Sequence, residues 1–120
     1  MDFSRVLCVD GDASFLLALK RGLERHGFDV ITAAHGVDAL IRYESHSGDF
    51  AALVIDHDMP VMNGLDLTRS VRAMGFEGRI IIMAGNLTSG DLRACQEYKI
   101  SGFFTKPFDA DLLATMFGRG

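Results

Sequence analysis

Short apolar runs alternate along the chain with amphipathic segments, and the two patterns predict strands and helices in turn. The apolar runs predict five strands, at residues 5–9, 28–33, 51–55, 79–83 and 102–105. The amphipathic segments predict five helices, at residues 14–26, 36–46, 63 through 71, 88–99 and 109–117. Strands that are apolar throughout and alternate with helices are typical of a parallel sheet covered by helices on both faces.

Residues typical of helix ends support these boundaries. Gly27 directly follows the first predicted helix, where glycine commonly ends a helix. Asn63 is a candidate capping residue for the third helix, and Thr88 or Ser89 for the fourth. The pattern therefore predicts five strand–helix pairs and an α/β fold.

Length and composition indicate a single globular domain spanning residues 1–120. The chain has 120 residues, 48% of them hydrophobic, which suffices for a sizeable core. Its apolar runs are too short to span a bilayer, and its N-terminus lacks a basic region followed by a long apolar stretch. We therefore expect a cytoplasmic protein with neither a membrane segment nor an export signal.

Charge and cysteine usage narrow the class of partner. Sixteen acidic and twelve basic residues give a net charge of -4, and the basic residues are scattered rather than clustered. This distribution argues against direct binding of nucleic acid. Cys8 and Cys95 lie far apart within predicted elements, so we expect reduced thiols in the core or on a helix.

Chemically useful side chains follow the predicted strands at the edge where parallel strands end. Asp10 and Asp12 come after the first strand, Asp56 after the third and Lys106 after the fifth. The ligand crevice of an open α/β sheet lies outside these carboxyl ends. Grouped carboxylates repel one another unless a cation joins them, which indicates a hard divalent ion, Mg²⁺. Beside Mg²⁺ and a lysine, Asp56 can attack phosphorus, and the arrangement predicts an aspartyl-phosphate site.

Two stretches carry a resemblance to a known family. From Asp56 to Gly64 the chain reads DHDMPVMNG, which matches the pattern D-x-x-M-P-x-M-[DN]-G, and residues 105–108 read TKPF. On these motifs the chain resembles the receiver domain of two-component response regulators over essentially its whole length. The resemblance implies a flavodoxin-like, doubly wound (βα)5 fold whose five-stranded parallel sheet has the order 2-1-3-4-5.

The resemblance also implies roles for individual residues. Asp56 would accept a phosphoryl group from a histidine kinase or a histidine phosphotransfer protein, and Lys106 would pair with the carboxylate or the phosphate. The backbone carbonyl of Asp58 would be a metal ligand beside Asp10 and Asp56. The Lys106–Pro107 peptide bond would be cis.

The chain departs from the family pattern at the metal site. Asp10 matches the first of two adjacent acids and would reach the metal through water, but Gly11 stands where the family has a direct ligand. Asp12 could compensate in part through an outer-sphere contact. We therefore expect weak Mg²⁺ binding.

A second departure concerns the residues that respond to phosphorylation in the family. Ala84 stands where a threonine or serine hydroxyl would bond a phosphoryl oxygen, and Phe103 occupies the position of the switch aromatic residue without a hydroxyl. A lost hydrogen bond to a charged group is worth about 1.5–3 kcal/mol, enough to remove much of a conformational bias. Switching by the usual pair is therefore not expected.

Some residues near Asp56 allow more than one interpretation. Asp12 could cap the first helix or take part in metal binding. The side chain of Asp58 is expected to face solvent, although it could disfavour the phosphoryl group or stand in for the missing ligand. His57, between the two acids, is expected to be exposed on the loop.

Three classes of function follow. The first is a phosphoacceptor, not an enzyme, that signals to a downstream protein through a surface made by the fourth helix, fifth strand and fifth helix. The second is a pseudo-receiver, a binding module that phosphorylation does not switch, for which Gly11 and Ala84 argue. The third is a hydrolase of the haloacid dehalogenase type, which carries the signature hDxDx[TV]. The segments around Asp10 and Asp56 match only the start of this signature.

Overall fold

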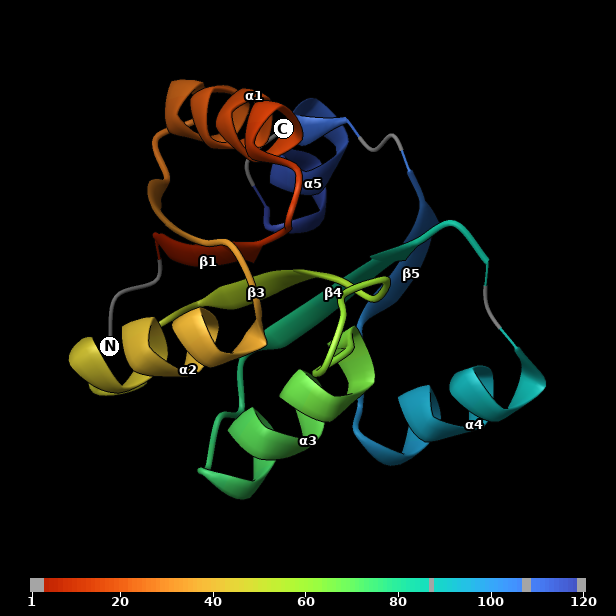
Figure 1. Ribbon diagram of the computed structural model, residues 1–120. Helices are drawn as coiled ribbons and strands as arrows, with labels where there is room; N and C mark the ends of the chain where they lie inside the picture. Colours follow the sequence, from red (N-terminus) through yellow and green to blue (C-terminus); the bar gives the residue numbers. More distant parts are fainter. Residues whose placement is uncertain (1–3, 87, 107–108, 119–120) are drawn as a thin grey trace.

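Five parallel strands form one sheet, with a helix after each strand (Figure 1). The computed structural model describes residues 4–86, 88–106 and 109–118. The elements are β1 (Arg5–Val9), α1 (Ala13–Arg25), β2 (Asp29–Ala33), α2 (Gly36–Ser45), β3 (Ala52–Asp56), α3 (Gly64–Ala73), β4 (Arg79–Ala84), α4 (Ser89–Glu97), β5 (Gly102–Thr105) and α5 (Ala110–Met116). All the predicted strands and helices are present, and β3 continues through Asp56 itself.

The sheet has the order β2-β1-β3-β4-β5, which confirms the flavodoxin-like topology. All neighbouring pairs are parallel, with Cys8 opposite Val54 and Asp56 opposite Met83. Because the strands run in one direction, their carboxyl ends lie along a single edge of the sheet. The side chains predicted to act together are therefore brought to one side of the molecule.

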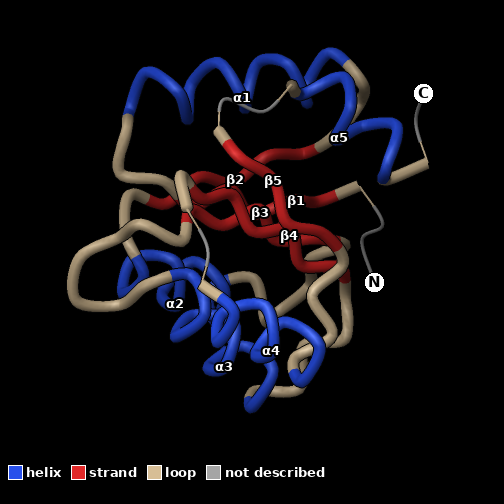
Figure 2. Tube along the Cα trace, turned by 90° about the vertical axis from the view of Figure 1, so that its right-hand side faces the viewer, coloured by secondary structure: helices blue, strands red, loops and turns tan. Residues whose placement is uncertain are grey.

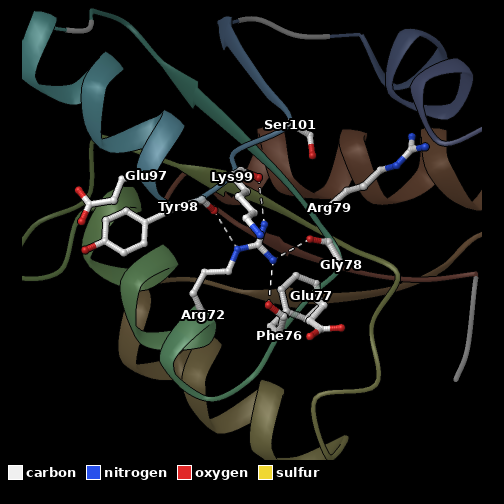
Figure 3. A pocket seen from close by; sticks show the side chains of 9 residues that line it. All are labelled: Arg72, Phe76, Glu77, Gly78, Arg79, Glu97, Tyr98, Lys99 and Ser101. Atoms are coloured by element: carbon white, nitrogen blue, oxygen red, sulfur yellow. Dashed lines mark hydrogen bonds between the residues drawn. The ribbon is translucent and has the colours of Figure 1, made fainter.

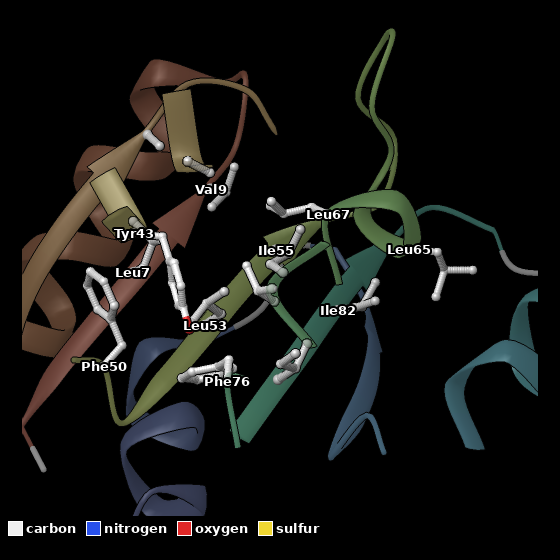
Figure 4. Close-up of a cluster of buried hydrophobic side chains, with 14 of the residues drawn as sticks. Leu7, Val9, Tyr43, Phe50, Leu53, Ile55, Leu65, Leu67, Phe76 and Ile82 are labelled. Atoms are coloured by element: carbon white, nitrogen blue, oxygen red, sulfur yellow. The ribbon is translucent and has the colours of Figure 1, made fainter. Parts of the chain in front are cut away.

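Helices cover the sheet on both faces, with α1 and α5 on one side and α2, α3 and α4 on the other (Figure 2). Successive strand residues point to opposite faces, and each face carries its own apolar cluster. One cluster joins the sheet to α1 and α5 through Cys8, Val54, Leu23 and Leu113, among others. The other, on the α2–α4 side, includes Leu7, Val9, Tyr43, Phe50, Leu53, Ile55, Leu65, Leu67, Phe76 and Ile82 (Figure 4).

The two cysteines are free and buried, as predicted. Desolvation in the interior strand β1 raises the pKa of Cys8 to about 12. Burial also raises the pKa of Cys95, which lies on α4. Among the described residues, every helix is too short or too polar to cross a lipid bilayer.

At the opposite edge of the sheet, one guanidinium group connects three segments of the chain. Arg72 of α3 lies in a cavity of about 620 Å³ and donates hydrogen bonds to the carbonyls of Phe76, Gly78, Tyr98 and Lys99, all at 2.9–3.0 Å (Figure 3). The first two carbonyls precede β4, and the other two lie in the turn between α4 and β5. Arg72 therefore fixes the C-terminal end of α4 to α3.

We predict that Arg72→Met lowers the free energy of unfolding by about 3 kcal/mol, because a hydrogen bond made by a charged group contributes roughly 1.5–3 kcal/mol and part of this side chain is exposed. Urea unfolding followed by circular dichroism measures the change. Arg69→Met is the matched control, because Arg69 lies on the same helix and makes an exposed ion pair with Asp66 at 3.4 Å. A loss as small for Arg72→Met as for Arg69→Met would contradict the prediction.

Candidate functional site

The structure brings together the lysine and two of the acids that follow the strands. Asp10 comes directly after β1, Asp56 ends β3 and Lys106 follows β5. The Nζ atom of Lys106 lies 2.5 Å from Oδ2 of Asp10 and 3.3 Å from Oδ2 of Asp56. Asp10 and Asp56 are only 2% and 6% exposed, so one ammonium group is shared by two buried acids.

The loops after the strands hold the other oxygen of each carboxylate. The N–H of Asp12 donates to Oδ1 of Asp10 at 2.8 Å, and the N–H of Asp58 donates to Oδ1 of Asp56 at 3.0 Å. Both bonds join residues two positions apart, so the turn that leaves each strand also orients its acid. Among the described residues, Lys106 is the only polar partner of Asp10 Oδ2.

Opposing effects act on the pKa of Lys106. Burial lowers it, but the hydrogen bond and charge of Asp10 and the charge of Asp56 outweigh burial, so that the pKa lies above its ordinary value. The ammonium group also lies 5.0 Å from the centroid of the Phe15 ring, within range of a cation–π contact. Lys106 is therefore a permanent positive charge beside Asp56 at neutral pH.

The described carboxylates offer a divalent cation only a small set of ligands. Within these residues no group of three or more histidine, cysteine or acidic side chains is arranged to hold a metal. The side chain of Asp12 accepts hydrogen bonds from the N–H groups of Ser14 and Phe15 and caps α1, one of its two predicted roles. Magnesium is often held by one or two carboxylates and several waters, and Asp10 and Asp56 fit a site of this kind.

Asp58 has an exposed side chain, as expected, yet this side chain makes a specific contact. Its Oδ2 accepts a hydrogen bond of 2.9 Å from the N–H of Gly85, the first residue after β4. The same residue donates its own N–H to Asp56. Asp58 thus joins the acid at the end of β3 to the loop that leads to α4, a link that the sequence did not indicate.

The expectation that His57 is exposed is wrong. His57 is 9% exposed, and its N–H donates to the carbonyl of Met83 at 2.8 Å. Its ring nitrogen Nε2 lies 3.8 Å from Oδ2 of Asp91 on α4. The alternation of side chains along β3 could have indicated this position. His57 is two residues after Ile55 and four after Leu53, and both of these face the α2–α4 side.

The two predicted switch positions lie on β4 and β5. Ala84 is 1% exposed at the end of β4 and is paired in register with Thr105. It presents a methyl group at the position where a threonine or serine would present a hydroxyl. Phe103 is half-buried and packs against the core on the α2–α4 side. Pro107 and Phe108, including the predicted cis peptide bond, lie outside the described residues.

Comparison with known proteins places most of the chain in one family. Residues 6–117 match the family model of the response regulator receiver domain. The chain is 35% identical over 104 residues to the transcriptional regulatory protein PrrA of Mycobacterium tuberculosis, an alignment that covers 87% of this chain and 44% of PrrA. It is 32% identical over 112 residues to chemotaxis protein CheY1 of Helicobacter pylori, covering 91% of this chain and 90% of CheY1.

A similar fold is found among solved structures. The chain superposes with a TM-score of 0.82 and 25% identity on a chain of the CheX-CheY-BeF3-Mg²⁺ complex from Borrelia burgdorferi, covering 92% of this chain and 84% of the other. The chain therefore spans less than half of PrrA but most of the chemotaxis proteins that it matches.

We predict that Lys106→Met lowers the free energy of unfolding at pH 7 by roughly 2 kcal/mol, less than a fully buried pair would lose, because the lysine is partly exposed. Since its pKa is raised by folding, its stabilisation is complete below the unfolded pKa of about 10.4 and disappears as pH rises through the folded value. The difference from the parent protein should therefore be constant between pH 7 and 9 and shrink above pH ~10.4.

Urea titrations across this pH range measure the difference. Lys20→Met is the matched control, because Lys20 pairs with Glu24 at 2.8 Å on the surface of α1. Equal stability of the Lys106→Met and Lys20→Met variants at pH 7 would refute the role given to Lys106.

Proposed function

Because the chain belongs to the response regulator receiver domain family of two-component systems, we propose that Asp56 accepts a phosphoryl group from a histidine kinase or a histidine phosphotransfer protein. The proposed role is that of a phosphoacceptor that signals by protein contact, rather than that of an enzyme. The observation that carries the proposal is the position of Lys106 Nζ, 3.3 Å from Oδ2 of Asp56 at the carboxyl edge of the sheet.

In the proposed transfer, a carboxylate oxygen of Asp56 attacks the phosphorus atom. An acyl–phosphate P–O bond forms while the bond from phosphorus to the donor histidine nitrogen breaks, and that nitrogen keeps the electron pair. Lys106 balances negative charge on the phosphoryl oxygens, and its second contact with Asp10 keeps the ammonium group in place. The N–H of Asp58 orients the carboxylate before the attack.

Receiver domains generally bind Mg²⁺, and the CheY relative from Borrelia burgdorferi was crystallised with it. In this chain Asp10, Asp56 and the backbone carbonyl of Asp58 would hold the ion, which would neutralise phosphoryl oxygens during transfer. Gly11 contributes no side chain, and Lys106 competes for both carboxylates. We therefore propose weak Mg²⁺ binding through few protein ligands and several waters.

The proposed output surface consists of α4, β5 and α5. Leu92 on α4 and Leu112 on α5 are about half exposed, at 50% and 49%. Large apolar side chains exposed on the helices before and after β5 are suited to contact with a downstream protein.

The alternative function is that of a pseudo-receiver that binds a partner without being switched by phosphate. Two observations favour it: Gly11 and Ala84 lack the groups that would hold a metal and a phosphoryl oxygen, and the described carboxylates form no group of three. Chemical phosphorylation separates the two functions.

We predict that incubation with acetyl phosphate and millimolar Mg²⁺ adds one phosphoryl group to the protein, because the carboxylate of Asp56 is oriented by the N–H of Asp58 and lies next to a lysine. Intact mass spectrometry measures the adduct, and Asp56→Asn should show none. A parent protein that remains unmodified by acetyl phosphate, and by beryllofluoride as a phosphoryl mimic, would establish the pseudo-receiver.

We predict that Gly11→Asp increases the affinity for Mg²⁺ about tenfold, because it supplies a direct carboxylate ligand. The site has room for the side chain, since a Cβ at Gly11 would meet only the carbonyl of Ala34, at 3.7 Å. Isothermal titration calorimetry measures the affinity. Ala73→Asp, which adds the same charge at the exposed end of α3, should leave it unchanged; equal affinities for both variants would exclude position 11 as a ligand position.

A further inference from the structure

Helix α4 is held at its two ends by contacts of different strength. At the C-terminal end, Arg72 donates to the carbonyls of Tyr98 and Lys99 at 2.9 and 3.0 Å. At the N-terminal end, His57 and Asp58, the two residues that follow β3, make polar contacts with α4 and with the loop before it. The C-terminal end is thus fixed by a charged group with two short bonds, whereas the N-terminal end depends on the residues that follow Asp56.

Hydrogen bonds and close packing hold the backbone of His57 in place. Its N–H bonds to Met83, and its carbonyl accepts from the N–H groups of Met59 and Gly64. A Cβ at Gly64 would come within 2.8 Å of the Cα of His57, so α3 packs directly against this backbone. The backbone of His57 is therefore fixed, and its ring, only 10% exposed, lies close to Asp91 of α4.

The contact between His57 and α4 is incomplete. Nε2 of His57 lies 3.8 Å from Oδ2 of Asp91, which is longer than a hydrogen bond, and Nδ1 is buried with no hydrogen-bond partner among the described residues. Asp91 also accepts the N–H of Thr88 at 3.0 Å in the capping box that begins α4. A small movement of the N-terminal end of α4 would therefore shorten or break this contact.

Asp58 makes the second connection within a single residue. Its N–H donates to Oδ1 of Asp56, while its carboxylate accepts the N–H of Gly85. Ala84, the neighbour of Gly85, has no hydroxyl through which the end of β4 could sense a group on Asp56. One described route from Asp56 to the loop before α4 therefore passes through Asp58.

We propose that His57 and Asp58 hold the N-terminal end of α4 to the end of β3, where Asp56 lies, so that a change at Asp56 reaches α4 through these two side chains. The signalling consequence rests on the proposed function, whereas the two contacts belong to the unmodified protein. A phosphoryl group on Asp56 adds negative charge beside the Asp58 carboxylate and weakens its bond to Gly85 by like-charge repulsion. The N-terminal end of α4 then moves while Arg72 retains the C-terminal end.

Amide exchange resolved by NMR tests the contacts in the unmodified protein. His57→Phe, Asp58→Ala and Asp91→Asn should each increase exchange of residues 88–92 by about threefold, the change expected from the loss of one weak, partly exposed polar contact. His57→Gln, whose amide can donate to Asp91, should restore most of the protection. Exchange of residues 96–100, next to Arg72, should remain at the parent rate in every variant.

Asp66→Asn is the matched control, because Asp66 occupies the same capping-box position on α3 as Asp91 does on α4. The Asp91→Asn variant keeps an oxygen that can accept from Thr88, so it changes the partner of His57 without removing the cap. If residues 88–92 exchange at the parent rate in His57→Phe and in Asp91→Asn, or equally fast in Asp66→Asn, the proposal is wrong.

Beryllofluoride with Mg²⁺ tests whether His57 and Asp58 transmit a change at Asp56 or only stabilise the unmodified protein. In the parent protein it should alter exchange of residues 88–92, and in the variant that combines His57→Phe with Asp58→Ala this response should be lost. Fluorine NMR shows whether the variant binds beryllofluoride. If it does, and exchange of residues 88–92 still changes as much as in the parent protein, the proposal is wrong while the proposed function stands. A parent protein that binds no beryllofluoride would overturn the proposed function, and the rates of the unmodified variants would still decide whether the two contacts hold α4.

Discussion

One ammonium group holds three strand ends of this sheet together. Lys106 follows β5, yet it pairs with Asp10 after β1 and with Asp56 at the end of β3. Two carboxylates this deeply buried repel each other strongly unless a cation lies between them. The same ion pair therefore stabilises the carboxyl edge of the sheet and determines the charge that an incoming phosphoryl group would meet, so stability and chemistry cannot be changed independently there.

Much of the fold and the centre of the site could be predicted because both follow from simple periodicity. Strands that are apolar throughout require cover on both faces, and parallel strands necessarily end at one edge. For that reason Asp10, Asp56 and Lys106 could be placed together without knowing any loop conformation. The strand order came from the resemblance of two short motifs, not from periodicity, which does not distinguish one order of parallel strands from another.

The residues that sequence reasoning missed act through contacts between elements far apart in the chain. The carbonyls that Arg72 binds belong to turns whose direction no local pattern reveals, and the bond from Asp58 to Gly85 depends on the approach of two loops. His57 was misplaced because it was treated as a loop residue, although β3 extends to its immediate neighbour. For Asp12 the sequence leaves two roles open, and the geometry of α1 shows that it caps this helix.

The positions of the two cysteines give the molecule built-in reporters of two different motions. Cys8 lies on β1, is fully buried and has a strongly raised pKa. A thiol reagent can therefore react with its thiolate only after the sheet opens. Cys95 lies on α4 and donates through its sulfur to the carbonyl of Asp91. Labelling of Cys95 would therefore report movement of α4 away from the sheet. Comparing the labelling rates of Cys95 and Cys8 then separates a local movement of α4 from unfolding of the whole domain.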